Sequence, residues 1–227
     1  MAGPIGSSQF MYNSSGASSF YDYQIEQSAR FDDAGGGTNA SSRLSRTFGT
    51  ASSATKFTFS VWVKRSLTYE NGGNTEWQQI ICRDTGVSTG TGSAFGFESG
   101  GGTSGGLDNR DRLAWYGHSG STGGSGTGDD RIEGQWRDTT GWYHIVIRAD
   151  TTQGTAANRL KLYVNGVQET SFSTAAYPSQ NDNTGANTTD IPITIGNRQG
   201  HSLFFNGYQC ECVLSLINIS EPTRLGM

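Results

Sequence analysis

Charged side chains, cysteines and long hydrophobic runs are all scarce in this sequence. Charged residues make up 16% of its 227 residues, against roughly 25% in an average domain. Together with 33 glycines, this composition disfavours a coiled coil or a helical bundle. No run of about eighteen apolar residues occurs, so we expect no membrane insertion. The net charge of −4 argues against nucleic acid as the main partner.

The cysteines and the N-terminal residues both favour synthesis in the cytoplasm. No lysine or arginine precedes Arg30, and no continuous apolar stretch lies there, so we expect no secretory signal peptide. The cysteines, Cys82, Cys210 and Cys212, are odd in number. We expect Cys210 and Cys212 to share one face of a strand, at a separation too wide for an unstrained disulfide.

Short apolar alternations separated by polar turns fill the chain from residue 23 onward. FTFSVWVK (57–64) alternates without a break, and it places Trp62 on the face opposite to Phe57. This period of two predicts a strand. WYHIVIRAD (142–150) alternates with apolar residues on both sides, which is typical of a central strand covered on both faces.

The sequence also predicts one hairpin and several further strands. Asn165-Gly166 follows an alternating segment and supplies the two positive-φ positions of a type I′ turn. Further strands are expected at 25–31, 43–48, 77–83, 94–98, 112–117, 191–195 and 203–212. No apolar pattern of helical period extends over three turns. We therefore predict an all-β, two-sheet antiparallel β-sandwich.

Glycine-rich and serine-rich segments flank and interrupt these strands. Residues 1–22 form a Gly/Ser-rich N-terminal arm with a few aromatic side chains. Two low-complexity segments, 98–109 and 117–130, border the predicted strand DRLAWYG. We expect both segments to be mobile loops, because glycine has maximal backbone freedom.

The order of these motifs resembles a laminin-G-like, concanavalin-A-like jellyroll. The resemblance covers about 190 residues, and we assign 23–213 to this domain. It implies that Trp62 and Trp142 occupy core positions. The motifs that carry it are ARFDD (29–33), FTFSVWVKR (57–65), WYHIVIRADTT (142–152), LKLYVNGV (160–167), ITIGN (193–197) and FFNGYQCE (204–211).

More narrowly, YDYQIEQSARF (21–31) together with the later motifs is similar to jellyroll proteins of marine tailed phages. That resemblance implies a place on the tail or particle surface, with other virion proteins as partners. The chain would then be made in the host cytoplasm and reside in the virion.

The C-terminal segment departs from the family pattern. LSLINISEPTR (214–224) resembles one reading frame of a transposon-based sequencing adapter. We therefore expect 214–227 to be adapter-derived and the last strand of the domain to be truncated. The alternative is a genuine apolar tail that matches by chance.

The sequence offers little for catalysis. Some jellyroll relatives hydrolyse glycosides with paired carboxylates in an E-x-D-x-x-E pattern, which is absent here. The nearest acidic groups lie in or beside Gly-rich segments, which seldom hold a catalytic pair rigidly. The histidines are scattered. We predict a non-enzymatic protein, with a glycoside hydrolase as the least favoured alternative. These acids and histidines are Asp108, Asp111, Asp129, Asp130, Glu133, His118, His144 and His201.

Two acidic pairs are candidates for a structural Ca²⁺. Asp32-Asp33 stands where the resembled family often has an acidic turn, and Asp129-Asp130 lies in a Gly-rich loop. Hard cations favour such oxygen ligands. A side chain capping a turn is the commoner role of these residues.

Weak carbohydrate binding to cell-surface glycans is the function we expect for this module. Sugars are recognised by exposed aromatic rings beside amide and carboxylate groups, and loops on a rigid scaffold often supply them. Each aromatic could instead fill the core, and a structural virion domain without ligand is the alternative. The candidate residues are Trp77, Trp115, Tyr116, Trp136, Asn109, Asp111 and Gln135.

Overall fold

The described residues of the computed structural model form two antiparallel sheets and one short 3₁₀ turn, η3 (Ala156–Asn158). The backbone of 93, 116, 130–133 and 174 is described without side chains. The described residues are 27–32, 42–49, 53, 55–68, 78–83, 93–98, 111–116, 130–175, 177–184, 192–197 and 204–215.

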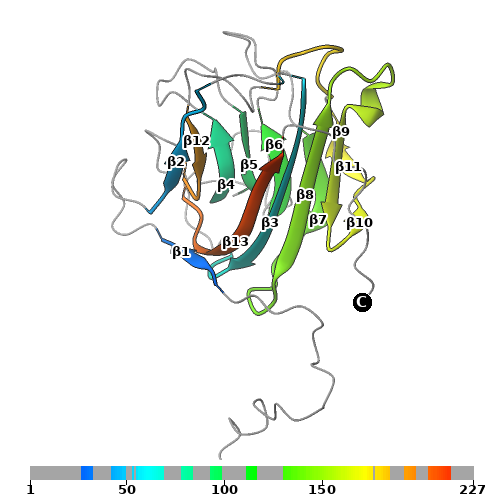
Figure 1. Cartoon of the computed structure of the whole chain (residues 1–227). Coiled ribbons are helices and arrows are strands. Elements are labelled where there is room, and N and C mark those ends of the chain that lie inside the picture. Colours follow the sequence, from blue (N-terminus) through cyan, green and yellow to red (C-terminus); the bar gives the residue numbers. More distant parts are fainter. Residues whose placement is uncertain are drawn as a thin grey trace, which may run out of the picture.

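One sheet has six strands and the other has seven, and they face each other (Figure 1). The six-stranded sheet runs in the order β1 (Ala29–Phe31), β13 (Gly207–Ser215), β3 (Lys56–Arg65), β8 (Tyr143–Asp150), β9 (Leu160–Val164) and β10 (Val167–Gln168). The seven-stranded sheet runs in the order β11 (Phe172–Thr174), β7 (Asp130–Gln135), β6 (Arg112–Tyr116), β5 (Ser93–Phe97), β4 (Gln78–Arg83), β12 (Ile193–Ile195) and β2 (Leu44–Arg46). The predicted all-β sandwich is confirmed.

A single hydrophobic core lies between the sheets. Alternate residues of β3, from Phe57 to Val63, are 2% exposed or less. Phe95 and Phe97 of β5 face them from the other sheet and belong to the same core cluster. A small cavity of about 10 Å³ remains at one side of the core, lined by Phe95, Trp115, Ile147, Leu160, Leu162, Phe172 and Tyr177.

The predicted hairpin is present between β9 and β10. Val164 pairs with Val167 across Asn165-Gly166, whose φ angles are 51° and 78°. These are the two positive-φ positions that a type I′ turn requires. The Asn165 side chain also accepts a hydrogen bond from the backbone N–H of His144 at 2.9 Å, which fixes the turn against β8.

Two strands of the seven-stranded sheet, β7 and β11, were not predicted. β7 contains one large apolar residue, Ile132, and therefore shows no alternation. It forms because β6 and β11 pair with it on both sides. The expected loop at 117–130 therefore ends in a strand at Asp130.

The predicted arm at 1–22 lies outside the described residues, as does most of the segment from 214 to 227. Leu214 and Ser215 continue β13 and pair with Phe59 and Thr58 of β3. Leu214 also packs against the core. The adapter origin of this segment stays a prediction.

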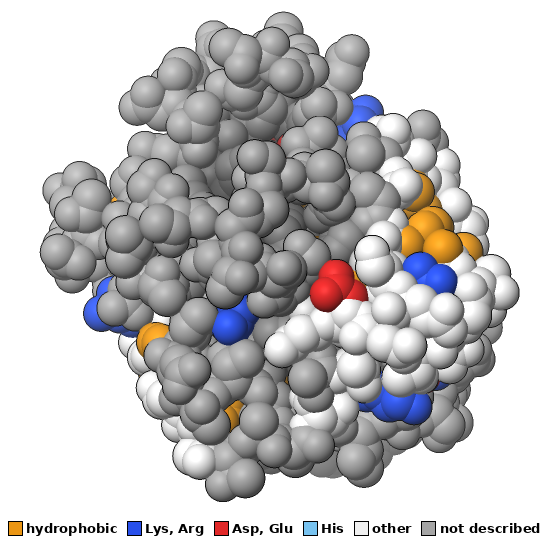
Figure 2. Space-filling model, turned by 90° about the horizontal axis from the view of Figure 1, so that it is seen from above, with side chains coloured by type: hydrophobic (Ala, Val, Ile, Leu, Met, Phe, Trp, Pro, Cys, Tyr) orange, Lys and Arg blue, Asp and Glu red, His pale blue; other side chains and the backbone are white. Residues whose placement is uncertain are grey.

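Among the described residues, no helix is long and apolar enough to cross a membrane. Seen from above, the end of the sandwich shows described hydrophobic side chains only in small separate groups, between polar and charged ones (Figure 2). No broad apolar surface marks a site on the described part of that end.

Candidate functional site

An aromatic pair lies on the outward face of the six-stranded sheet. Trp62 of β3 and His144 of β8 are cross-strand partners. Their rings stack with centroids 4.8 Å apart and an interplanar angle of 27°. Both side chains are half-buried, so part of each ring remains at the surface. The pair faces outward because the residues on either side of Trp62, Val61 and Val63, point into the core.

His144 is held in place by polar neighbours. Its Nε2 lies 2.9 Å from the hydroxyl of Ser60, a residue on the same outward face. Burial lowers the pKa of His144, and the nearby carboxylate of Glu211 opposes that shift only in part. The ring is therefore neutral at pH 7, and its nitrogens can donate and accept one hydrogen bond each.

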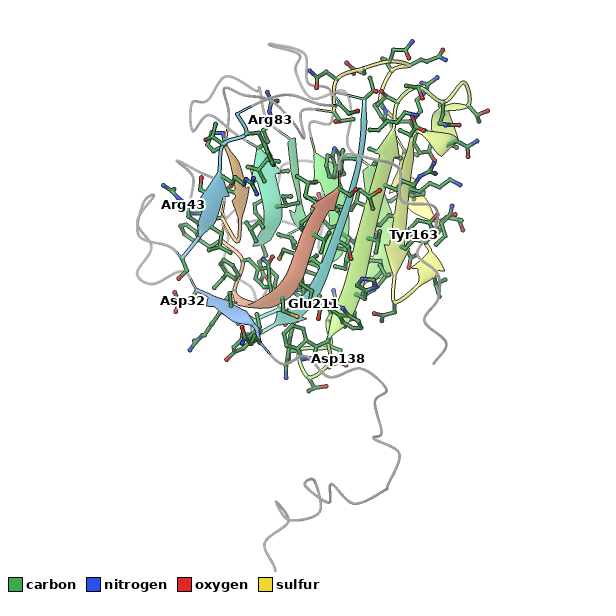
Figure 3. All side chains as sticks on the ribbon, viewed as in Figure 1. Asp32, Arg43, Arg83, Asp138, Tyr163 and Glu211 are labelled. Carbon is green, nitrogen blue, oxygen red and sulfur yellow. The ribbon has the colours of Figure 1, made fainter. Side chains whose placement is uncertain are left out.

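A bulge in β13 brings Glu211 to this face. The register against β3 shifts between Cys210 and Val213, and Glu211 has a φ of 50°. Glu211 is exposed and lies on β13 where that strand borders β3 (Figure 3). A carboxylate thus stands near the aromatic pair.

The same bulge separates the two neighbouring cysteines. Cys210 is paired with Trp62 and faces outward, whereas Cys212 packs against the core. The prediction that they share one face is therefore wrong, because it assumed a regular strand. Burial raises the pKa of Cys210 to about 11 and of Cys212 to about 12. Both are free thiols.

Three cationic side chains lie on the same outward face, one beside the aromatic pair and two further along β8 and β9. Lys64 is the next outward residue along β3 and pairs with Tyr208 of β13. Arg148 and Lys161 are cross-strand partners on β8 and β9. The side chains of Lys64, Arg148 and Lys161 are half-buried.

Trp115 is a core residue, which corrects its assignment as a surface platform. It is 7% exposed and stacks on Phe57 with ring centroids 5.4 Å apart. Leu113 and Trp115 share the inward face of β6 and belong to the core cluster. The side chain of Tyr116, one position further on, lies outside the described part of the structure.

Asp111 is likewise internal, so its assignment as a sugar ligand is wrong. It is 1% exposed, and its carboxylate accepts hydrogen bonds from Arg65 Nη2 at 2.7 Å and from Arg137 Nε at 3.0 Å. Arg65 is also 1% exposed. Burial lowers the pKa of Arg65, and the attraction of Asp111 opposes that shift. The carboxylate is thus committed to an internal ion pair.

Two other predicted ligands lie close to this ion pair. Trp136 is half-buried against the core, and its carbonyl accepts a hydrogen bond from Arg65 Nη1 at 2.6 Å. Gln135 is exposed at the end of β7. Trp77 and Asn109 lie outside the described residues, so their predicted roles stay predictions.

The described residues contain no group of three or more His, Cys, Asp or Glu side chains able to hold a metal ion. Asp32 accepts a hydrogen bond from the Ser42 hydroxyl at 3.3 Å. Asp33 and Asp129 lie outside the described residues, and Asp130 is described only as the first residue of β7. Calcium binding at either acidic pair stays a prediction.

Trp62 and His144 were not among the site residues predicted from the sequence. Trp62 was treated as part of the core because the resembled family places a core residue there. The strand alternation already placed Trp62 on the polar side of FTFSVWVK, with Ser60 and Lys64. That alternation was the signal that could have identified it.

Comparison with a family model covers most of the chain. The model described as the concanavalin A-like lectin/glucanases superfamily, Laminin_G_3, matches residues 35–214. No curated protein matches.

Several solved structures share the fold at low sequence identity. A putative carbohydrate-binding protein from Bacteroides ovatus is 15% identical, with a TM-score of 0.51 over 86% of this chain and 44% of that one. The K499G mutant of NanB sialidase from Streptococcus pneumoniae is 14% identical, with a TM-score of 0.50 over 86% of this chain and 26% of that one. The binding domain of botulinum neurotoxin serotype G is 12% identical, with a TM-score of 0.50 and coverages of 86% and 43%. This chain spans less than half the length of each of them.

Proposed function

This chain belongs to the concanavalin A-like lectin/glucanases superfamily, and we propose that it is a non-catalytic carbohydrate-binding module. Its glycan site is the outward face of the six-stranded sheet, centred on Trp62 and His144. The observation that carries this proposal is the half-buried aromatic pair with a hydroxyl and a carboxylate beside it. The presence of a putative carbohydrate-binding protein and a sialidase among the chains that share this fold supports it.

The aromatic pair suits a sugar ring for physical reasons. The C–H-bearing face of a pyranose is apolar and packs against an aromatic face, as other apolar groups do. Stacking against His144 and packing beside β13 hold the Trp62 ring in one orientation, which lowers the entropy lost on binding. The neutral His144 ring and the Glu211 carboxylate then offer partners for sugar hydroxyls.

We further propose that the module is displayed on a phage particle and contributes to host attachment. The resemblance of 21–31 and the later motifs to marine tailed-phage proteins supports this location. Many copies on one particle would turn weak single-site binding into strong attachment. Mass spectrometry of purified particles for peptides of this chain tests the location directly.

The glycan site is tested with Trp62→Ala and Trp62→Phe on a glycan array, followed by affinity measurement on the strongest ligand. We expect Trp62→Ala to weaken binding about tenfold or more, because a central tryptophan often carries much of the binding energy. Trp62→Phe keeps an aromatic face and should retain a large part of the affinity.

Leu44→Ala is the matched control. Leu44 is 56% exposed on β2 of the other sheet, so the change removes a large apolar side chain away from the site. Equal affinity of the Trp62→Ala and Leu44→Ala proteins would contradict the site. If the wild-type protein bound no glycan on the array, a structural module without ligand would replace the proposal.

A further inference from the structure

A row of three side chains crosses the outward face of the six-stranded sheet beyond the aromatic pair. Thr58 of β3 pairs with Arg148 of β8, and Arg148 pairs with Lys161 of β9. We call these three residues the cationic row. Its β8 member, Arg148, lies four residues along that strand from His144. At the usual strand rise this separation is about 13 Å.

The two cations of this row have no acidic partner among the described residues. Neither the Arg148 nor the Lys161 side chain takes part in an ion pair or a hydrogen bond there. The next outward residue on β8, Asp150, lies 3.5 Å from Lys56 Nζ and accepts hydrogen bonds from Thr152 and Gln153. Like charges directly opposite each other in a sheet are destabilising, so this arrangement is unfavourable without a counter-charge.

Two polar atoms of the row are buried and lack a hydrogen-bond partner. They are Thr58 Oγ1 and Arg148 Nε. Thr58 as a whole is only 4% exposed. An unsatisfied buried donor carries its full desolvation penalty. A ligand with several acceptor oxygens would relieve both penalties and neutralise the paired cations at once.

We propose that the cationic row binds the anionic group of an acidic polysaccharide, a carboxylate or a sulfate ester, whose chain continues to Trp62 and His144. This inference rests on the proposed carbohydrate-binding function and names its ligand class. The row and the aromatic pair face the same side of one sheet, and the two side chains between them, Val146 and Tyr163, are 4% and 5% exposed. A short oligosaccharide can span that distance.

The first experiment compares three polymers with one backbone: dextran, carboxymethyl dextran and dextran sulfate. Affinities are measured by biolayer interferometry at physiological ionic strength, where long-range attraction is screened. We expect the wild-type protein to prefer an acidic polymer over dextran. The two acidic polymers distinguish a carboxylate from a sulfate ligand. The double variant Arg148→Gln/Lys161→Gln should lose about tenfold or more of its affinity for the preferred acidic polymer.

Arg43→Gln/Arg46→Gln is the matched control, because it removes two exposed cations from the β2 region of the other sheet. Thermal unfolding of both double variants confirms that they are folded. An equal loss of affinity in the two double variants, or no loss in the Arg148/Lys161 protein, would overturn the proposal.

A second measurement keeps the row testable even if no polymer binds. The Nε–H signal of Arg148 is followed by NMR while glucuronate, glucose 6-sulfate or glucose is added. We expect a saturable shift with an acidic sugar and none with glucose. A shift at Arg148 combined with unchanged glycan binding by Trp62→Ala would retain the anion site and reject the aromatic site. No shift with either acidic sugar would reject the anion site itself.

Discussion

Arg65 shows how one buried charge organises its surroundings. Its guanidinium donates hydrogen bonds to Asp111, to the carbonyl of Trp136 and, at 3.3 Å, to Gln78. It also lies 4.2 Å from the centroid of the Phe97 ring. These contacts join β3, β4 and β5 to the residue before β6 and the residue after β7. Each of its three nitrogens donates a hydrogen bond inside the protein, so we assign it a structural role.

Asp111→Asn tests this role with little change in shape. Asparagine keeps the size of the side chain and tolerates the positive φ of 61° at this position. The change leaves a buried arginine without its counter-charge, and we expect a loss of about 3 kcal/mol or more in the free energy of unfolding. Urea denaturation measures it.

Asp138→Asn is the control for that variant. Asp138 is exposed, and its carboxylate accepts hydrogen bonds from the backbone and hydroxyl of Thr140, which lower its pKa. We expect its midpoint to stay close to that of the wild-type protein. Equal midpoints for the two variants would show that the Arg65–Asp111 pair contributes nothing to stability.

Individual site residues were the hardest features to predict from the sequence. Alternation states which residues share a face, but it does not state which face is buried. The strand containing Trp115 was predicted, yet only the sheet packing shows that its Trp115 face points inward. The contact of Asp111 with Arg65 joins residues 46 positions apart, and no local pattern reveals it.

At the scale of elements, β13 depends on a glycine at its start. Gly207 lies between Phe31 of β1 and Arg65 of β3 and has a φ of 151°. A Cβ atom there would lie 2.2 Å from the carbonyl oxygen of Lys64. The close approach of β13 to β3 therefore requires the absence of a side chain.

Gly207→Ala should consequently destabilise the fold. We expect a loss of about 1–3 kcal/mol in the free energy of unfolding, from the strained φ and the backbone clash. Thermal and urea denaturation both measure the effect. Gly154→Ala is the control, because a Cβ at Gly154 would meet no atom within 4 Å. Its stability should stay unchanged or rise by up to about 1 kcal/mol. An equally small effect at Gly207 would contradict the close approach.

Elements with strong local signals were predictable, and those formed by pairing alone were not. The alternation of β3 and the Asn165-Gly166 turn act within a few residues, and both were found. β7 has no such local signal. It is stabilised by pairing with its two neighbours in the sheet, which a local sequence pattern does not reveal. The bulge after Cys210 was also missed, since CEC reads as a regular strand in the sequence.

At the scale of the whole molecule, both sheets contribute to one core cluster. Phe59 of β3 and Phe95 of β5 belong to it together, with exposures of 1% each. Neither sheet can expose its inner face without also exposing the other. The described part of the chain should therefore unfold in one cooperative transition.

This cooperativity can be tested with one probe on each sheet. In a Cys210→Ser/Cys212→Ser background, Cys82 is the only thiol in the sequence, and it is 2% exposed on β4 of the seven-stranded sheet. Its labelling during urea unfolding reports that sheet, and circular dichroism reports the whole fold. We expect the two midpoints to coincide in this background. Phe59→Ala, on the other sheet, should then lower the free energy of unfolding by about 3–5 kcal/mol. Both midpoints should shift together, whereas a shift seen only by circular dichroism would show that the two sheets unfold independently.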